Sequence, residues 1–346
     1  MAIDVTILGA GVFGLGCAWA MARRGAKVRV VDPNGVGAGA SGGIVGALAP
    51  HVPEQWNDKK AFQLDSLLMA RDWWKAVVEV GGDDPGYART GRLQPIPDKA
   101  AHALAMERAV GAATLWQEHA TWTVEPAPQE WSPGTPTVIR DTLSARIHPR
   151  RACEALASAI RAMGGEIVPS GDIGGFVLHA TGWQGLIAMR DDRGRTAGTG
   201  VKGQAALLRL DRRDLPQLYT DGMHIVPHSD GTVAVGSTSE REFADTSTDD
   251  RLDDLLARAC TAVPALVGAE VLQRWAGVRP RARSRAPLIG AWPGRDGHFV
   301  ANGGFKIGFG VAPKVAEVMA DLILSGTDNI PGPFRTDHLA PWTSGV

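Results

Sequence analysis

A strand–helix–strand unit at the start of the chain restricts the fold more than any other feature. Residues 3–8 have the pattern of a buried strand, and a glycine-rich turn over residues 9–14 follows at once. Apolar residues then recur at helical spacing over 15–24, and a second strand over 27–31 ends at Asp32. A strand, a GxGxxG turn, a helix, a strand and a terminal acid in this order predict a dinucleotide-binding Rossmann unit. An ordinary glycine turn with a surface aspartate is the alternative.

Each glycine of the turn has a separate physical task. Gly9 permits the tight turn, Gly11 lets the backbone approach a pyrophosphate, and Gly14 lets the helix pack close to the strand. The pyrophosphate then meets free N–H groups and the positive end of the helix dipole. Asp32 can accept hydrogen bonds from a ribose hydroxyl. The turn by itself is compatible with either NAD or FAD.

The segment after Asp32 favours FAD. A nicotinamide-binding domain would continue with another helix and strand, whereas residues 35–43 form a Gly/Ala/Ser loop. A loop with so little side-chain bulk suits a chain that lies against a large flat ligand. The other interpretation is a flexible linker, but the run 44–49 that follows is too apolar for an idle linker.

Composition excludes several other classes of protein. The chain has 346 residues and a formal net charge of -1, so it lacks the positive surplus of bulk nucleic-acid and anionic-membrane binders. Its length predicts about two domains, and no segment reaches the ~18 consecutive apolar residues of a membrane span. The separated cysteines Cys17, Cys153 and Cys260 exclude a disulfide framework and a CxxC metal pair. We therefore expect a cytoplasmic protein with no metal ion.

Further motifs, in their order along the chain, resemble the D-amino acid oxidase-like flavoenzymes, a family that includes glycine oxidase and sarcosine oxidase. Residues 148–163 read as a helix and 166–168 as a strand, and residues 178–183 are similar to the family signature A-T-G-x-W-S. The Ala-Gly-Val-Arg-Pro segment at 276–280 is the most glycine-oxidase-like piece, and the glycine-rich segment 303–308 completes the series. The resemblance covers most of the chain.

The resemblance implies an α/β fold, with a Rossmann-like FAD-binding domain of the GR2 type and a discontinuous α+β substrate domain on a mostly antiparallel sheet. The family usually inserts a strand pair where this chain has only residues 169–176, which puts the detail of the central loop in question. The expected boundaries are 1–50, 141–200 and 288–346 for the FAD-binding domain, and 51–140 and 201–287 for the substrate domain.

The resemblance also implies which residues contact FAD. Attachment is expected to be non-covalent, because sarcosine oxidase uses a cysteine late in the chain and the last cysteine here is Cys260. In the family, the N-terminus of the last helix, here 311–325, faces the flavin pyrimidine and stabilises the reduced anion. The expected cofactor-binding residues are Gly9, Gly11, Val12, Phe13, Gly14, Asp32, Pro33, Ala40, Ser41, Gly42, Gly46, Ala47, Leu48, Val168, Thr181, Gly182, Trp183, Arg279, Gly303, Gly304, Phe305, Lys306, Ile307 and Gly308.

The implied reaction is FAD-dependent oxidation of a small amino acid or secondary amine, such as glycine, an N-alkyl glycine or a D-amino acid. A hydride passes to flavin N5 and water hydrolyses the imine, so no nucleophile or metal is required, and the protein holds and polarises the substrate. The electron acceptor is O2 or another carrier. The lysine that activates oxygen in sarcosine oxidase has no clear counterpart in residues 230–236.

Four residues are the candidates for substrate contact. Arg279 matches the family's carboxylate anchor, and a guanidinium grips a carboxylate with two parallel hydrogen bonds. Lys306 matches a second position, where glycine oxidase carries an arginine, and it either contacts a carboxylate or lies in solvent. His51 and His224 either accept the amine proton or bind the substrate as neutral imidazoles, or they are structural.

Other functions stay open at this point. One is a flavin subunit of a hetero-oligomeric amino acid or opine dehydrogenase, whose partner would bind residues 279–285. This segment includes Arg281, Arg283 and Arg285. The same arginines can instead be solvated, or they can admit an acidic substrate. Another is a tRNA-modification-type oxidase, which the net charge disfavours. A nicotinamide-only dehydrogenase or a non-catalytic nucleotide-binding module is the last. The expected partners are an amine substrate and an electron acceptor, and a homo-oligomer is left open.

Overall fold

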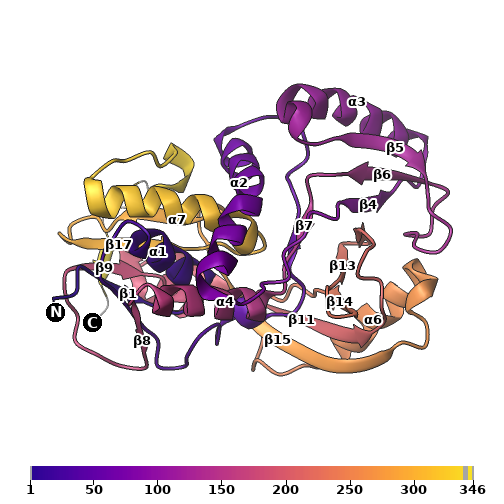
Figure 1. Cartoon of the computed structure of the whole chain (residues 1–346). Helices are drawn as coiled ribbons and strands as arrows, with labels where there is room; N and C mark the ends of the chain where they lie inside the picture. Colours follow the sequence, from indigo (N-terminus) through magenta and orange to yellow (C-terminus); the bar gives the residue numbers. More distant parts are fainter. Residues whose placement is uncertain (1, 338–341, 345–346) are drawn as a thin grey trace.

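A six-stranded sheet and an eight-stranded sheet organise the computed structural model, which describes residues 2–337 and 342–344 (Figure 1). The strand order of the six-stranded sheet is β16-β17-β9-β1-β2-β8. All its neighbours are parallel except β16 and β17, which are antiparallel. Its strands are β1 (Val5–Leu8), β2 (Val28–Val31), β8 (Glu166–Val168), β9 (Phe176–His179), β16 (Leu288–Ala291) and β17 (His298–Asn302).

The predicted strand–helix–strand unit is confirmed. Strands β1 and β2 pair in parallel, and helix α1 (Val12–Ala22) connects them. The helix begins three residues earlier than the apolar spacing indicated, because the glycine turn itself provides the first helical turn, with Gly11 as the N-cap. Every residue of α1 is buried, so this helix lies inside the core beside the six-stranded sheet.

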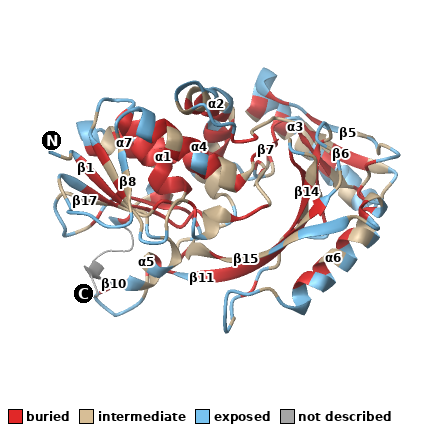
Figure 2. Ribbon diagram, turned by 60° about the horizontal axis from the view of Figure 1, so that its bottom comes forward, coloured by how far each residue is buried: buried red, intermediate tan, exposed pale blue. Residues whose placement is uncertain are grey.

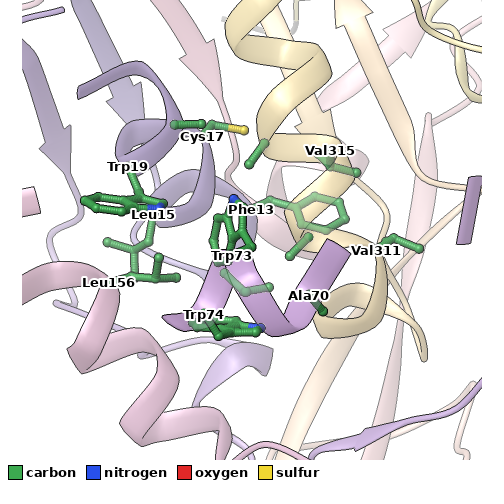
Figure 3. Close-up of a cluster of buried hydrophobic side chains, with 14 of the residues drawn as sticks. Phe13, Leu15, Cys17, Trp19, Ala70, Trp73, Trp74, Leu156, Val311 and Val315 are labelled. Atoms are coloured by element: carbon green, nitrogen blue, oxygen red, sulfur yellow. The ribbon is translucent and has the colours of Figure 1, made fainter. Parts of the chain in front are cut away.

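Three further helices surround α1 and complete one apolar core. They are α2 (Asp58–Gly81), α4 (Pro149–Ala162) and α7 (Gly308–Ser325). Figure 3 shows Trp73 of α2 between Trp19 and Phe13 of α1, with Trp74 below it, and all four belong to one buried cluster with Val311 of α7. The predicted helix at 148–163 is confirmed as α4, and the predicted last helix is confirmed as α7.

The eight-stranded sheet has the order β15-β11-β14-β13-β12-β4-β6-β5 and is antiparallel except between β4 and β12. Strands β11 and β15 are its longest, and they curve from it towards the six-stranded sheet (Figure 2). Its strands are β4 (Arg92–Pro95), β5 (Trp122–Pro126), β6 (Thr137–Asp141), β11 (Gly198–Arg209), β12 (Gln217–Thr220), β13 (Met223–Pro227), β14 (Thr232–Gly236) and β15 (Glu270–Ala282).

Shorter elements join or flank the two sheets. Strand β3 (Ala47–Leu48) pairs with β7 (Ala145–Arg146), and β10 (Met189–Asp191) pairs with β18 (Trp342–Ser344). The remaining helices are α3 (Lys99–Trp116), α5 (Gly182–Ala188), α6 (Asp250–Ala262) and the short 3-10 helices η1 (Ala40–Gly42), η2 (Gln117–His119), η3 (Pro264–Leu266) and η4 (Gly332–Phe334). Within the described ranges, none of the helices combines the length and the hydropathy needed to cross a membrane.

The position of α2 bears on the domain boundaries, which remain a prediction. This helix belongs to the segment 51–140 that we assigned to the substrate domain. Its buried Trp73 and Trp74 nevertheless share a core with α1 and α7, and the indole of Trp73 donates to Glu317 of α7 over 3.0 Å. Helix α2 therefore packs with the expected FAD-binding part.

Candidate active site

A cavity of about 950 Å³ lies where the carboxyl ends of β1 and β2 approach strand β15. In open α/β sheets, ligands bind at this edge of the parallel strands. Most residues expected to bind FAD or substrate line this one space. These are Gly9, Gly11, Val12, Phe13, Asp32, Pro33, Ala40, Ser41, Gly46, Ala47, Thr181, Gly182, Trp183, His224, Arg279, Gly303, Gly304, Phe305, Lys306 and Gly308.

The glycine turn at one end of the cavity is too tight for side chains. Gly9 has a φ of 110°, and a Cβ there would lie 2.4 Å from the carbonyl oxygen of Ala180. A Cβ on Gly14 would lie 1.9 Å from the carbonyl oxygen of Gly9. Gly14 therefore lies beneath the turn, outside the cavity lining, and lets α1 start directly against the strand end.

Asp32 is fixed at the end of β2, as its position in the sequence predicted. One carboxylate oxygen accepts from the backbone N–H of Ala10 over 2.8 Å, and the other accepts from Asn34 over 2.9 Å. Each oxygen keeps a further lone pair for a ligand hydroxyl. The backbone N–H of Asp32 donates to the carbonyl of Val168 over 3.1 Å, so Val168 supports the cavity edge without lining it.

Hydrogen bonds anchor the Gly/Ala/Ser loop, which favours a loop that borders a ligand over a flexible one. Ser41 Oγ accepts from the N–H of Val12 over 3.0 Å, which holds the loop against the start of α1. Arg150 of α4 donates to the carbonyl of Gly42 over 2.8 Å and to Gln273 of β15 over 3.0 Å. Gly42 therefore does not line the cavity, and its carbonyl instead accepts the hydrogen bond that fixes the loop. The sequence reasoning gave Arg150 no role.

Three other expected residues lie off the cavity lining. Leu48 is buried in the core shared with α1, and Ile307 is the N-cap residue of α7. His51 binds Gln63 of α2 through both its backbone N–H and its ring Nδ1. The structure therefore does not bring His51 together with the other substrate candidates.

Arg279 projects from β15 into the cavity and is held by a short segment after β14. Its Nη1 donates to the carbonyl of Thr238 over 3.3 Å, and its Nη2 donates to Ser237 Oγ. A Cβ on Gly203 of β11 would lie 2.0 Å from Nη2, so only glycine leaves room for the guanidinium. Burial lowers the pKa of Arg279 to about 10, and the charge of Glu240 acts in the opposite direction. The group is still charged at neutral pH.

The segment that holds Arg279 is itself fixed to β11. Glu240 is buried, and its carboxylate accepts from Thr238 Oγ and, over 3.0 Å, from Gln204 Nε2. The N–H of Gln204 donates to Thr238 Oγ over 2.8 Å. The buried Lys202 lies 3.8 Å from Glu240. This network was not foreseen, because its members come together only through the pairing of distant strands.

Phe305 and Lys306 close the cavity beside Arg279. Phe305 has a left-handed φ of 44°, and its N–H donates to the carbonyl of Pro280 over 3.0 Å. The Phe305 ring contacts both Lys306 Nζ, at 5.9 Å, and the guanidinium carbon of Arg281, at 5.7 Å. Burial and the positive charge of Arg279 lower the pKa of Lys306.

His224 faces the same end of the cavity from β13. Its ring packs against Tyr219 with 4.7 Å between centroids, and Nδ1 has no hydrogen-bond partner in the described part of the chain. Burial lowers the pKa of His224 to about 3, and the charges of Arg92 and Lys306 act in the same direction. The imidazole is therefore neutral at physiological pH and has a ring nitrogen available to a ligand.

The start of α7 completes the donor set. Gly308 and Phe309 line the cavity, and no side chain caps the first turn of this helix. Free N–H groups at a helix N-terminus stabilise negative charge on a ligand. No group of three or more His, Cys, Asp or Glu residues suited to a metal ion occurs in the residues that the structure describes. The donors, the glycine cradle and Asp32 together fit a dinucleotide with a flat ring.

Comparisons with known proteins agree with this geometry. The family described as "FAD dependent oxidoreductase" (DAO) matches residues 4–322. Glycine oxidase of Pseudomonas putida is 30% identical, with 97% of this chain and 99% of that protein covered. Glycine oxidase from Geobacillus kaustophilus has the same fold, with a TM-score of 0.82 at 21% identity over 97% of this chain and 99% of that one. Iminodiacetate oxidase from Chelativorans sp. gives a TM-score of 0.81 at 20% identity over 96% and 98%.

Proposed function

Because the chain belongs to the DAO family of FAD-dependent oxidoreductases, we propose that it oxidises a small amino acid or secondary amine whose carboxylate Arg279 binds. The observation that carries this proposal is a half-buried, charged guanidinium that forms no ion pair with a carboxylate of the described residues and lies at the same cavity as the glycine turn. A desolvated charge without a counterion is costly, so an anionic ligand stabilises this arrangement. The relatives named glycine oxidase support the same substrate class.

The cofactor is FAD, and the cavity residues suggest how it is held. The free N–H groups at the start of α1 suit the pyrophosphate, and Asp32 suits a ribose hydroxyl. The loop around Ser41 and the start of α7 would border the rest of the molecule. When bound, FAD supplies the acceptor for the electron pair that leaves the substrate.

Arg279 orients the substrate. Two parallel N–H groups of its guanidinium can bind both oxygens of one carboxylate, while Nη1 and Nη2 also donate to the Thr238 carbonyl and to Ser237 Oγ, which hold the group in place. A carboxylate fixed in this way fixes the adjacent carbon, whose C–H bond breaks. Misplacement by about 1 Å costs on the order of a hundredfold in rate, so the contacts behind Arg279 matter as much as the residue itself.

His224 accepts a hydrogen bond from the substrate nitrogen. With a pKa of about 3 it is too weak a base to hold the amine proton at neutral pH, so we assign it an orienting role. The positive charge of Arg279 disfavours a protonated amine nearby, which leaves the nitrogen lone pair free. The substrate loses two electrons and two protons overall, and water converts the imine to a carbonyl compound and ammonia or a primary amine.

Product analysis tests the proposal. The FAD-loaded protein, incubated with glycine, sarcosine, iminodiacetate and both enantiomers of alanine and aspartate, should release a 2-oxo acid with ammonia or a primary amine from at least one of them. Parallel reactions with O2 and with an artificial electron acceptor distinguish an oxidase from a dehydrogenase. Arg279→Gln should raise KM strongly, because removing one partner of a desolvated charge pair costs roughly 2–5 kcal/mol. The proposal fails if no amine in the panel gives product, or if Arg279→Gln leaves KM unchanged.

A further inference from the structure

We propose that the substrate carries a second carboxylate and that Lys306 binds it, which makes Lys306 the residue that selects dicarboxylic amines over monocarboxylic ones. This inference rests on the proposed function, since it names the substrate class of the same cavity. It is carried by the distribution of charge around the space that Arg279 faces.

Among the described residues, the substrate end of the cavity is lined by positive side chains and by no carboxylate, since Glu240, whose charge acts on Arg279, lies outside the lining. Arg279 and Lys306 both line it, and the only acidic residue in the lining, Asp32, lies at the far end beside the glycine turn. Both Asp32 oxygens already accept backbone hydrogen bonds. Within residues 2–337 and 342–344, neither Arg279 nor Lys306 forms an ion pair with a carboxylate. One substrate carboxylate would offset only one of the two charges.

The positive charge continues outwards along β15. Arg279 and Arg281 lie two residues apart on an extended strand and therefore on the same face. The Phe305 ring contacts both Arg281 and Lys306, and Arg281 forms no ion pair within the described ranges. Both residues line the cavity, Lys306 being exposed and Arg279 half-buried, and the charge of Arg279 acts on Lys306. This order of cations attracts anions towards the cavity and places Lys306 within the reach of a substrate already held by Arg279.

Two other roles for Lys306 make different predictions. If Lys306 and Arg279 bound a single carboxylate together, removing Lys306 would weaken monocarboxylates and dicarboxylates equally. If Lys306 served only the reduced cofactor, its removal would shift the flavin reduction potential and leave the preference between acids unchanged. If Lys306 binds a second carboxylate, its removal should weaken the binding of dicarboxylates and leave that of monocarboxylates unchanged.

The first experiment measures binding without turnover. The FAD-loaded protein is titrated with acetate, malonate and succinate, and the change in visible flavin absorbance gives each Kd. We expect the best dicarboxylate to bind up to about fivefold more tightly than acetate, the size of one exposed ion pair. Lys306→Gln should bring this ratio close to one. Arg285→Gln, which removes an exposed charge outside the cavity lining, is the control and should keep the ratio.

The second experiment separates this inference from the proposed function. Values of kcat/KM are compared for glycine and sarcosine against iminodiacetate and both enantiomers of aspartate and glutamate. Preference for a dicarboxylic amine, lost in Lys306→Gln, supports the inference. Equal or better use of glycine and sarcosine overturns it and leaves the proposed function standing. An equal effect of Lys306→Gln on both classes also overturns it, and the absence of turnover with every amine refutes the proposed function.

Discussion

Gly203→Ala should displace Arg279 without unfolding the protein. The new Cβ would lie 2.0 Å from Arg279 Nη2 and 2.3 Å from Cζ. Ordinary contact begins at 3.4 Å, so the guanidinium must retreat by about 1.4 Å. The obstructed atoms are the free end of a flexible side chain, so the backbone pairing of β11 with β15 is retained. A shift of this size in a substrate-positioning group costs on the order of a hundredfold in kcat/KM.

The assay combines steady-state kinetics with thermal unfolding. Gly203→Ala should keep its bound FAD and change Tm by only a few degrees, since a stability change of about 1 kcal/mol shifts Tm by roughly 2–4 °C in a protein above 150 residues. Its kcat/KM should fall mainly through KM. Gly332→Ala is the matched control, because a Cβ at Gly332 meets nothing within 4 Å. Normal kinetics in a folded Gly203→Ala protein would refute the placement of Arg279.

Three further predictions concern residues that line the cavity or support its lining. Gly14→Ala should abolish FAD binding or folding, because the new Cβ would lie 1.9 Å from the backbone oxygen of Gly9. The flavin-to-protein absorbance ratio measures this loss. Gly16→Ala on the same helix is the control and should be tolerated, since the nearest atom to its Cβ lies 3.6 Å away. Arg150→Gln should weaken FAD binding about tenfold in titrations of the apoprotein, because it leaves the Gly42 carbonyl without its charged donor. Burial holds the pKa of His224 at about 3 against 6.5 when unfolded, so the unfolded chain binds a proton between these values. His224 thus contributes its full stabilisation above pH 6.5 and loses it as the pH falls, by up to about 1.4 kcal/mol per pH unit; His224→Asn should reduce that slope in urea unfolding.

Local sequence patterns predicted the parts of the site that short-range geometry determines. The glycine turn, Asp32 and the loop at Ser41 lie close together in sequence, and their tasks depend on backbone conformation and strand order. The structure brings these residues to one cavity, and their contacts with FAD remain a prediction. Helix α7 was likewise evident from its apolar spacing and Gly326, which ends it with a φ of 71°.

Sequence patterns did not reveal the contacts that depend on the register between distant strands. Gly203 is one of 43 glycines, and its role follows only from the pairing of β11 with β15. Glu240 and Lys202 meet through an isolated backbone bridge. His51 shows the converse case. Its place after the segment that borders the cavity made it a candidate for substrate contact, but its ring binds Gln63 of α2 and does not line the cavity.

Anaerobic titration of the FAD-loaded protein tests the central claim most directly. The account predicts that a carboxylate-bearing amine bleaches the visible absorbance of the bound flavin in proportion to the amine added. It also predicts that Arg279→Gln, still loaded with FAD, requires at least about thirtyfold higher concentration of the same amine to reach half of the maximal rate of bleaching, the equivalent of 2 kcal/mol. A flavin that no such amine bleaches, or the same concentration dependence of the bleaching rate for the two proteins, would contradict it.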